Sequence, residues 1–373
     1  MSASNFVTSA VIQHLYIHVP FCAHLCPYCG FFKTRNVPAE TRGFVPALLA
    51  ELRWARANFD VRPLTVYFGG GTPTALSVSQ LEELFAGWPW PLTAREFTVE
   101  ANPLTVSARK AAVLRAAGVN RVSLGAQAFD AASLRLLGRR HDADGVRATV
   151  AVLRAAGFDN LNLDLMYALP GQTFAQWASS LSAAVALAPE HLSAYNLSYE
   201  EDTEFFRRFI VSGGGADTDR EREFFLRTTA HLARHGYAQY EISNFARAGR
   251  ESAHNRAYWR GEDYLGCGPG ACSTVGLQRW QNLADNRRYI EALTVTGAPP
   301  RDIEPLTVKM KTAEKIMLGL RTREGVPLTL LTDQPDALEN LIREGLLTVS
   351  GDRAALTLAG RLVTDSVAEL LMG

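Results

Sequence analysis

Short strand-like runs alternate with longer helix-like segments through the first part of the chain, and this rhythm limits the fold more than any other feature. Runs rich in β-branched and aromatic residues occur at 14–20, 64–70, 96–103, 121–127, 160–170 and 191–199. Between them, segments such as 43–59 and 107–118 carry apolar residues at the spacing of an amphipathic helix. Alternating strands and helices predict a parallel sheet with helical crossovers. Six such units favour a partial (β/α) barrel, and a doubly wound sheet is the alternative.

The pattern changes after the sixth run. Segment 218–237 is predicted to be a capped amphipathic helix, and the Pro-rich stretch 296–305 is interpreted as a linker. The segments beyond that stretch resemble a small helix–strand–helix module of winged-helix type. We therefore expect a barrel over 1–245, a connecting region over 246–300 and a C-terminal domain over 301–373.

The composition is that of an ordinary soluble globular protein, with 47% apolar and 20% charged residues among 373. The 38 basic and 38 acidic residues cancel, so a polyanionic partner such as nucleic acid is not indicated. No apolar run reaches the roughly 18 residues of a membrane span, and the N-terminus lacks the pattern of a secretory signal. The expected compartment is the reducing cytoplasm, where clustered cysteines hold metal or do redox chemistry more often than they form disulfides.

Three of the five cysteines lie in one short segment. Cys22, Cys26 and Cys29 have the spacing C-x3-C-x2-C, while Cys267 and Cys272 lie far along the chain. A structural zinc site usually has four Cys or His ligands in two separated pairs. Three thiolates at this spacing instead suit a [4Fe–4S] cluster with one iron that the protein leaves without a ligand. Catalytic metal sites keep such an open position, so the predicted fourth ligand is not a protein side chain.

Several polar or glycine positions fall near the ends of the predicted strands. The phrase FGGGTPT contains Gly70, Gly71 and Thr72, and such glycines let backbone groups approach a ligand closely. Glu100 and Asp164 lie toward the carboxyl ends of apolar strands, where barrel enzymes build their sites. A carboxylate in such a strand is costly unless it is paired or binds something. A ligand site is favoured over a buried salt bridge.

The cysteine motif at the end of a first strand, with Tyr28 inside it, resembles the signature of the radical S-adenosylmethionine (SAM) superfamily. The resemblance implies a [4Fe–4S] cluster on the three cysteines, SAM on the open iron, and an electron donor such as flavodoxin or ferredoxin. It also implies that reductive cleavage of SAM yields methionine and a 5′-deoxyadenosyl radical. The implied fold is α/β: a partial (β/α)6 TIM-like barrel of the radical SAM type with a smaller α+β, winged-helix-like C-terminal domain.

A closer resemblance, over nearly the whole chain, is to the branch that contains oxygen-independent coproporphyrinogen III oxidase. Its phrases occur here as YIHVPFC, FGGGTPT, EANP, SLGAQAFD, LGRRH, DLMYALPGQT and YEISNFAR. The resemblance implies one set of SAM-binding residues, with Ala194 as a weaker candidate. The set comprises Tyr16, Gly70, Gly71, Thr72, Glu100, Gln127, Arg139 and Asp164.

Within that branch, three features resemble haem chaperones more than the decarboxylating enzyme. The enzyme has a further cysteine where this chain has Phe31, and it has a longer N-terminal extension. The stretch from His254 to Trp259 reads HNRAYW and matches the HNxxYW motif of the chaperones. The resemblance implies that the protein binds haem and passes it to haem-requiring acceptors such as respiratory proteins. It makes His254 a candidate haem ligand, since imidazole is a common axial ligand of haem iron.

One position departs from the family pattern. Cys272 occurs where relatives tend to have a histidine. A thiolate haem ligand, a redox pair with Cys267 and two ordinary buried small residues are all compatible with the sequence, and the last is favoured. The leading function is haem chaperoning with haem as cargo. Oxidative decarboxylation of coproporphyrinogen III and a radical SAM methyltransferase reaction that opens haem are the alternatives, so enzymatic activity is left open.

Overall fold

Six parallel strands form the centre of the fold. The structure is a computed structural model that describes residues 11–37, 41–211 and 217–373. The six strands lie side by side in chain order within a twelve-stranded sheet. They are β1 (Ile12–Val19), β4 (Val61–Gly70), β5 (Glu96–Ala101), β6 (Arg121–Gln127), β7 (Leu161–Tyr167) and β8 (His191–Asn196). Because their order never reverses, as it would in a doubly wound sheet, the predicted partial (β/α)6 barrel is confirmed.

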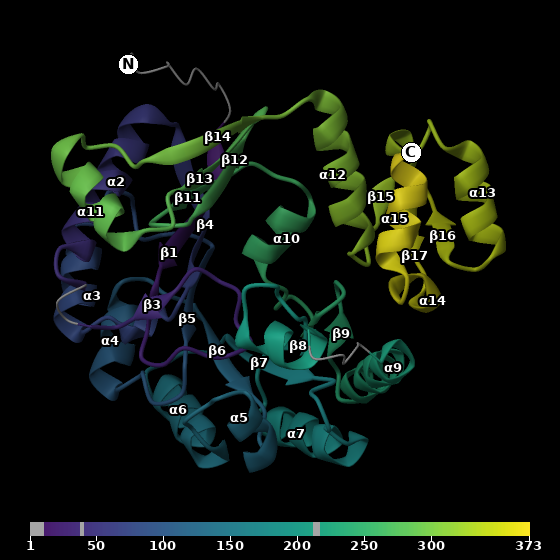
Figure 1. Ribbon diagram of the computed structural model, residues 1–373, viewed down its shortest axis with the longest axis horizontal. Coiled ribbons are helices and arrows are strands. Elements are labelled where there is room, and N and C mark those ends of the chain that lie inside the picture. Colours follow the sequence, from purple (N-terminus) through teal and green to yellow (C-terminus); the bar gives the residue numbers. More distant parts are fainter. Residues whose placement is uncertain (1–10, 38–40, 212–216) are drawn as a thin grey trace.

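Helices cover the outer face of these strands, as the arc of helices in Figure 1 shows. They are α2 (Phe44–Asn58), α3 (Val78–Ala86), α4 (Ala108–Ala116), α5 (Ala131–Leu136), α6 (Ala143–Ala155) and α7 (Phe174–Ala186). Side chains at the N-caps, such as Ser107 and Asp142, accept hydrogen bonds from the first turns of α4 and α6. Buried apolar residues of strands and helices form one continuous core between the two layers. Because the helices cover the outer face, the carboxyl-terminal ends of the parallel strands are the place where a ligand site is expected.

Further strands widen the sheet at both edges. Strand β11 (Tyr264–Cys267) pairs parallel to β1, and β12 (Cys272–Val275), β13 (Gln278–Asn282) and β14 (Arg301–Pro305) follow antiparallel. At the other edge lie β10 (Asn244–Ala246) and β9 (Ala238–Gln239), after α8 (Glu204–Phe206) and α9 (Thr218–Arg234). The interpretation of 296–305 as a linker is wrong for its second half, because β14 is an edge strand paired with β13.

Helix α10 (Ala253–Trp259) carries the HNRAYW stretch, and α11 (Asn286–Val295) packs on α2. The loop after β1 holds the short strands β2 (Phe21–Cys22) and β3 (Thr34–Arg35), which pair with each other. The division into a barrel over 1–245, a connecting region over 246–300 and a C-terminal domain over 301–373 stays a prediction. Part of the predicted barrel, residues 1–10, 38–40 and 212–216, lies outside the described residues.

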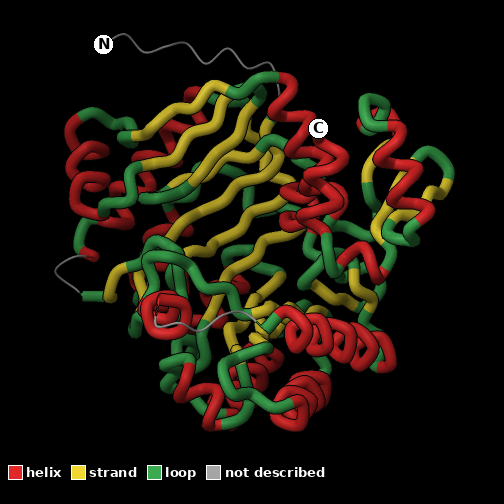
Figure 2. Tube along the Cα trace, turned by 45° about the vertical axis from the view of Figure 1, so that its right-hand side comes forward, coloured by secondary structure: helices red, strands yellow, loops and turns green. Residues whose placement is uncertain are grey.

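The C-terminal part is a small α+β unit with its own apolar core. Strands β15 (Val326–Pro327), β16 (Leu347–Ser350) and β17 (Arg353–Leu356) form a three-stranded antiparallel sheet. Around it pack α12 (Val308–Leu320), α13 (Pro335–Arg343), α14 (Leu358–Arg361) and α15 (Thr364–Met372). The views in Figures 1 and 2 place this unit beside the barrel, and in Figure 1 its helix α12 lies on the side toward α10.

Polar contacts join the C-terminal unit to the barrel. Arg256 of α10 and Arg260, directly after that helix, both pair with Glu324, which follows α12. Arg361 of α14 donates to Gln239 Oε1 of β9 at 2.6 Å. Helix α10 is therefore attached to the C-terminal unit at one side and, as described below, to the barrel sheet at the other.

Candidate functional site

One cavity gathers most of the residues that the sequence singled out. It has a volume of about 570 Å³ and lies at the carboxyl ends of the parallel strands. Its lining includes all three motif cysteines and seven of the eight predicted SAM residues; only Tyr16 is missing. The lining residues from these two sets are Cys22, Cys26, Cys29, Gly70, Gly71, Thr72, Glu100, Gln127, Arg139 and Asp164. Residues from five separate βα units thus converge on one space.

The motif cysteines lie in the loop that follows β1. Cys22 Sγ is 3.6 Å from Thr72 Oγ1, and Arg139 Nη1 donates to Cys26 Sγ at 3.5 Å. Burial raises the pKa of the Cys22 and Cys29 thiols, so a positively charged partner is needed to hold them as thiolates. Soft thiolate donors together with a nearby guanidinium fit an iron–sulfur cluster.

Among the described residues, no three Cys, His, Asp or Glu side chains are arranged as ligands of a single metal ion. The three cysteines line the same cavity, and their role as cluster ligands stays a prediction.

The glycines after β4 have no room for a side chain. Gly70 has a φ of 104°, and a Cβ there would lie 2.5 Å from His18 Cε1. A Cβ on Gly71 would lie 2.7 Å from the backbone carbon of Pro20, at the start of the cysteine loop. The Gly71 N–H donates to the Val19 carbonyl at 2.8 Å. The glycine loop is thus packed directly against the cysteine loop, as a shared ligand site requires.

Two partly buried carboxylates face the cavity. Glu100 Oε1 accepts a 2.9 Å hydrogen bond from the Tyr67 hydroxyl, and burial beside Asp164 raises the pKa of Glu100 to about 8. Asp164 accepts from Ser123 Oγ at 2.9 Å and from Asn162 Nδ2 at 2.8 Å, and burial raises its pKa as well. Because burial penalises both negative charges, a ligand with a positive charge or hydroxyl donors would stabilise this pair.

Gln127 is the last residue of β6, where the ladder with β7 has an irregular register, and the side chain of Arg139, which follows α5, reaches the same place. Gln127 has a φ of 64°, which is uncommon for a residue with a side chain and occurs often at functional sites. Arg139 Nη2 donates to the Gly125 carbonyl at 2.7 Å and also to the Asn102 side chain. Asn102 in turn donates to Thr72 Oγ1 at 2.7 Å, so the bulge, the arginine and the glycine loop are connected.

Tyr16 lies beneath the cavity rather than in its wall. Its hydroxyl hydrogen-bonds to His18 Nδ1 at 3.1 Å, and His18 Nε2 donates to the Phe32 carbonyl at 2.9 Å. Burial lowers the pKa of His18, which favours this neutral ring. Tyr16 thus supports the cysteine loop through His18. Ala194, the weaker candidate, is buried and does not line the cavity, whereas its neighbours Tyr195 and Asn196 do.

His254 is completely buried between α10 and the sheet. Its Nδ1 hydrogen-bonds to Thr65 Oγ1 at 2.7 Å, and its ring stacks on Tyr67 with centroids 5.1 Å apart. Burial, with His14 and Arg121 nearby, lowers the pKa of His254 to about 3, so the ring is neutral. Nε2 is enclosed without a hydrogen-bond partner. The ring thus packs against β4 through Thr65 and Tyr67, and the role of His254 as a haem ligand stays a prediction.

The two remaining cysteines differ from each other. Cys267 is buried in the main core, whereas Cys272 is exposed on β12, and both thiols are free. The expectation of an ordinary buried residue thus holds for Cys267 alone.

Sequence reasoning missed several residues that shape the cavity. Ser123 and Asn162 hold Asp164, Asn102 joins two loops, and Tyr195 lines the wall. Asn102 lies within the quoted phrase EANP and Ser123 begins the quoted phrase SLGAQAFD, and these phrases were the available signal. The others are single polar residues in strands, and only the packing of neighbouring strands shows what they contact.

Comparison with known proteins places the chain in a class. Residues 16–184 match the radical SAM superfamily, and residues 306–363 match the HemN C-terminal domain. The fold is thus that of a radical SAM protein, a superfamily whose cofactors are a [4Fe–4S] cluster and SAM.

Curated relatives narrow the assignment. The heme chaperone HemW of Bacillus subtilis is 36% identical over 379 residues, covering 97% of this chain and 100% of the relative. HemW of Escherichia coli is 33% identical, covering 96% and 97%. The chain belongs to the HemW family.

A solved structure agrees with this fold. Coproporphyrinogen III oxidase (HemN) from Escherichia coli, described as a radical SAM enzyme, superposes with a TM-score of 0.82 at 25% identity. The match covers 96% of this chain and 90% of the enzyme chain. In the part of the chain that the structure describes, no helix combines the length and apolarity needed to cross a membrane.

Proposed function

We propose that this protein binds haem and delivers it to haem-requiring acceptor proteins, while it carries a [4Fe–4S] cluster and SAM. The observation that carries the proposal is similarity over nearly the whole chain to HemW proteins, which are named heme chaperones. The cytoplasm, respiratory acceptors and a flavodoxin or ferredoxin as electron donor belong to the same proposal.

The cluster ligands in this proposal are Cys22, Cys26 and Cys29, because they line one cavity beside the Arg139 guanidinium. When bound, the reduced cluster supplies the electron that cleaves SAM. The backbone of Gly70 and Gly71 borders the place of the methionyl group. Glu100, next to the Gly70 N–H, receives the positively charged end of SAM.

Asp164 accepts ribose hydroxyls in the same arrangement, because Ser123 and Asn162 fix its carboxylate at the cavity wall. Gln127 and Arg139 complete the wall at the β6 bulge. Tyr16 supports the site indirectly, because its hydroxyl hydrogen-bonds to His18 and His18 hydrogen-bonds to the cysteine loop.

Phe31 favours chaperoning over decarboxylation. Its side chain is 71% exposed and lines the cluster cavity, at the position where the decarboxylating enzyme has a further cysteine. A phenyl ring supplies neither a thiol nor a proton to a substrate there. Oxidative decarboxylation of coproporphyrinogen III is kept as the second candidate because the enzyme's structure superposes over almost the whole chain.

The test uses full-length protein purified and reconstituted without oxygen. Haem is titrated and followed by its Soret band, and the haem complex is then mixed with an apo-acceptor haem protein. In parallel, coproporphyrinogen III, reductant and SAM are supplied, and protoporphyrinogen is measured. We expect stoichiometric haem binding, transfer to the acceptor and no protoporphyrinogen. Turnover without haem transfer would support the oxidase instead, and loss of the Soret band with reductant and SAM would support haem opening.

A further inference from the structure

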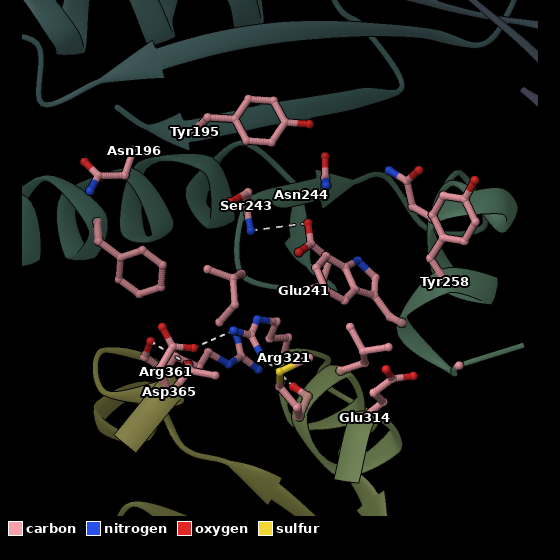
Figure 3. Close-up of a pocket in the computed structure, with 18 of the residues that line it drawn as sticks. Tyr195, Asn196, Glu241, Ser243, Asn244, Tyr258, Glu314, Arg321, Arg361 and Asp365 are labelled. Carbon is pink, nitrogen blue, oxygen red and sulfur yellow. Dashed lines mark hydrogen bonds and ion pairs between the residues drawn. The ribbon is translucent and has the colours of Figure 1, made fainter. Parts of the chain in front are cut away.

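A second, larger cavity lies between the barrel and the C-terminal unit. Its volume is about 1180 Å³, above the roughly 300–1,000 Å³ of common small-molecule sites. In Figure 3, Tyr195 and Tyr258 lie on the barrel side, and Arg321, Arg361 and Asp365 lie on the C-terminal side. Both parts of the molecule are therefore needed to form its walls.

The two cavities adjoin each other. Phe31, Tyr195 and Asn196 line both of them. The smaller cavity, at about 570 Å³, has to hold a cluster and SAM in the proposed function, which leaves the larger one for a third ligand. A ligand in the larger cavity would contact Phe31 and lie next to the cluster loop.

The HNRAYW stretch divides its side chains between the barrel and this cavity. His254 faces the sheet and is bonded to Thr65, whereas Asn255, Tyr258 and Trp259 line the larger cavity. Tyr264, from β11, adds another ring, 4.5 Å from Tyr258 between centroids. Several aromatic side chains on one wall suit a flat, apolar ligand.

Most basic side chains that line this cavity form ion pairs, whereas the exposed Arg222 forms none among the described residues. Arg321 pairs with Asp365, Arg279 with Glu314 at 2.8 Å, and Lys311 with Asp263 at 3.7 Å.

Arg361 is different, because it is partly buried yet forms no ion pair within the described ranges, and it donates to the neutral Gln239 amide oxygen. Burial and the neighbouring Arg323 lower the pKa of Arg361, and Glu241 in the same cavity acts in the opposite direction. A partly buried guanidinium without a carboxylate in ion-pair contact is a binding group for a carboxylate on a ligand.

We propose that haem lies in this interdomain cavity, with its ring against Tyr258 and Trp259 and a propionate on Arg361. This inference rests on the proposed function, since it locates the cargo. It assigns His254 the task of positioning α10, and it gives the C-terminal unit a direct part in recognising the carboxylates of haem.

The experiment compares haem with haem dimethyl ester, which has the same ring but no carboxylate charge. Both are titrated into anaerobic, full-length wild type, Arg361→Gln, Arg361→Lys and Trp259→Leu. Arg343→Gln is the matched control, because Arg343 belongs to the same unit, is exposed, and does not line the cavity.

We expect wild type to bind haem about tenfold more tightly than the ester, the usual scale of one charge-assisted hydrogen bond. Arg361→Gln should lose this preference by weakening haem alone, Arg361→Lys should retain part of it, and Trp259→Leu should weaken both ligands. The control should match wild type.

The inference is overturned if wild type binds both ligands equally, if Arg361→Gln weakens both alike, or if it keeps the preference. It is also overturned if Trp259→Leu binds both ligands as wild type does. Absence of haem binding by wild type is a different result, because it refutes the proposed function itself. The location of haem and its role as cargo are therefore judged separately.

Discussion

The substitution His254→Ala distinguishes between two roles of this residue, packing of α10 on the sheet and ligation of haem iron. The ring is fully buried, stacks on Tyr67 and forms a 2.7 Å hydrogen bond with Thr65 Oγ1. Removal of a buried aromatic ring costs about 3 kcal/mol or more, and one lost hydrogen bond adds about 1 kcal/mol. Partial collapse of the cavity offsets part of this, so we expect the free energy of unfolding to fall by about 3 kcal/mol at pH 7.5.

The loss should depend on pH. The folded pKa of His254 is lowered to about 3, below the unfolded value near 6.5. Between these values the unfolded chain binds the extra proton, so the contribution of the neutral ring is complete above pH 6.5 and falls as pH decreases toward 3. At about 1.4 kcal/mol per pH unit, the difference between wild type and His254→Ala should shrink by about 2 kcal/mol from pH 7.5 to pH 5.

The assay is urea unfolding of the full-length chain, followed by tryptophan fluorescence at both pH values, with haem titration at pH 7.5. The control is His235→Ala, because His235 is exposed after α9, and its change should stay within about 0.5 kcal/mol. A variant that keeps its stability at both pH values but loses haem would refute the packing role and restore His254 as a ligand.

Three further changes address the cluster cavity. Serine in place of Cys22, Cys26 or Cys29 should abolish the brown chromophore, since three thiolates leave no spare ligand; a retained spectrum would remove that cysteine from the set. Asp164→Asn should preserve the chromophore and weaken SAM about tenfold by equilibrium binding, whereas loss of iron would show that the carboxylate was misplaced. Gly70→Ala should lower SAM binding and the urea midpoint together, because its Cβ would meet an imidazole carbon at 2.5 Å; wild-type values for both would contradict the close packing.

The central fold was predictable because its signals are local. Each parallel strand is a short apolar run followed by an amphipathic helix, and strands in chain order produce the barrel without further information. The cysteine spacing likewise marks its own loop, and the glycine phrase ends β4 at the same edge of the sheet.

Other features depend on partners distant in the sequence. Strand β14 is exposed, carries charged residues and ends at Pro305, and this composition is typical of a loop. Edge strands nevertheless tolerate such residues, and here β14 is held by its pairing with β13. His254 looked available because its motif is polar, and only the packing of α10 on β4 buries it. The left-handed backbone of Gln127 occurs at an irregularity in the pairing of β6 with β7, and no local sequence pattern predicts that irregularity.

Iron and acid-labile sulfide, measured together with the ultraviolet–visible spectrum of anaerobically purified protein, test the central claim most directly. The account predicts about four irons and about four sulfides per chain, a broad brown absorption that bleaches on reduction, and a change in the electron paramagnetic resonance of the reduced cluster when SAM is added. Zinc in place of iron, or thiols that hold no metal after reconstitution with iron and sulfide, would contradict it.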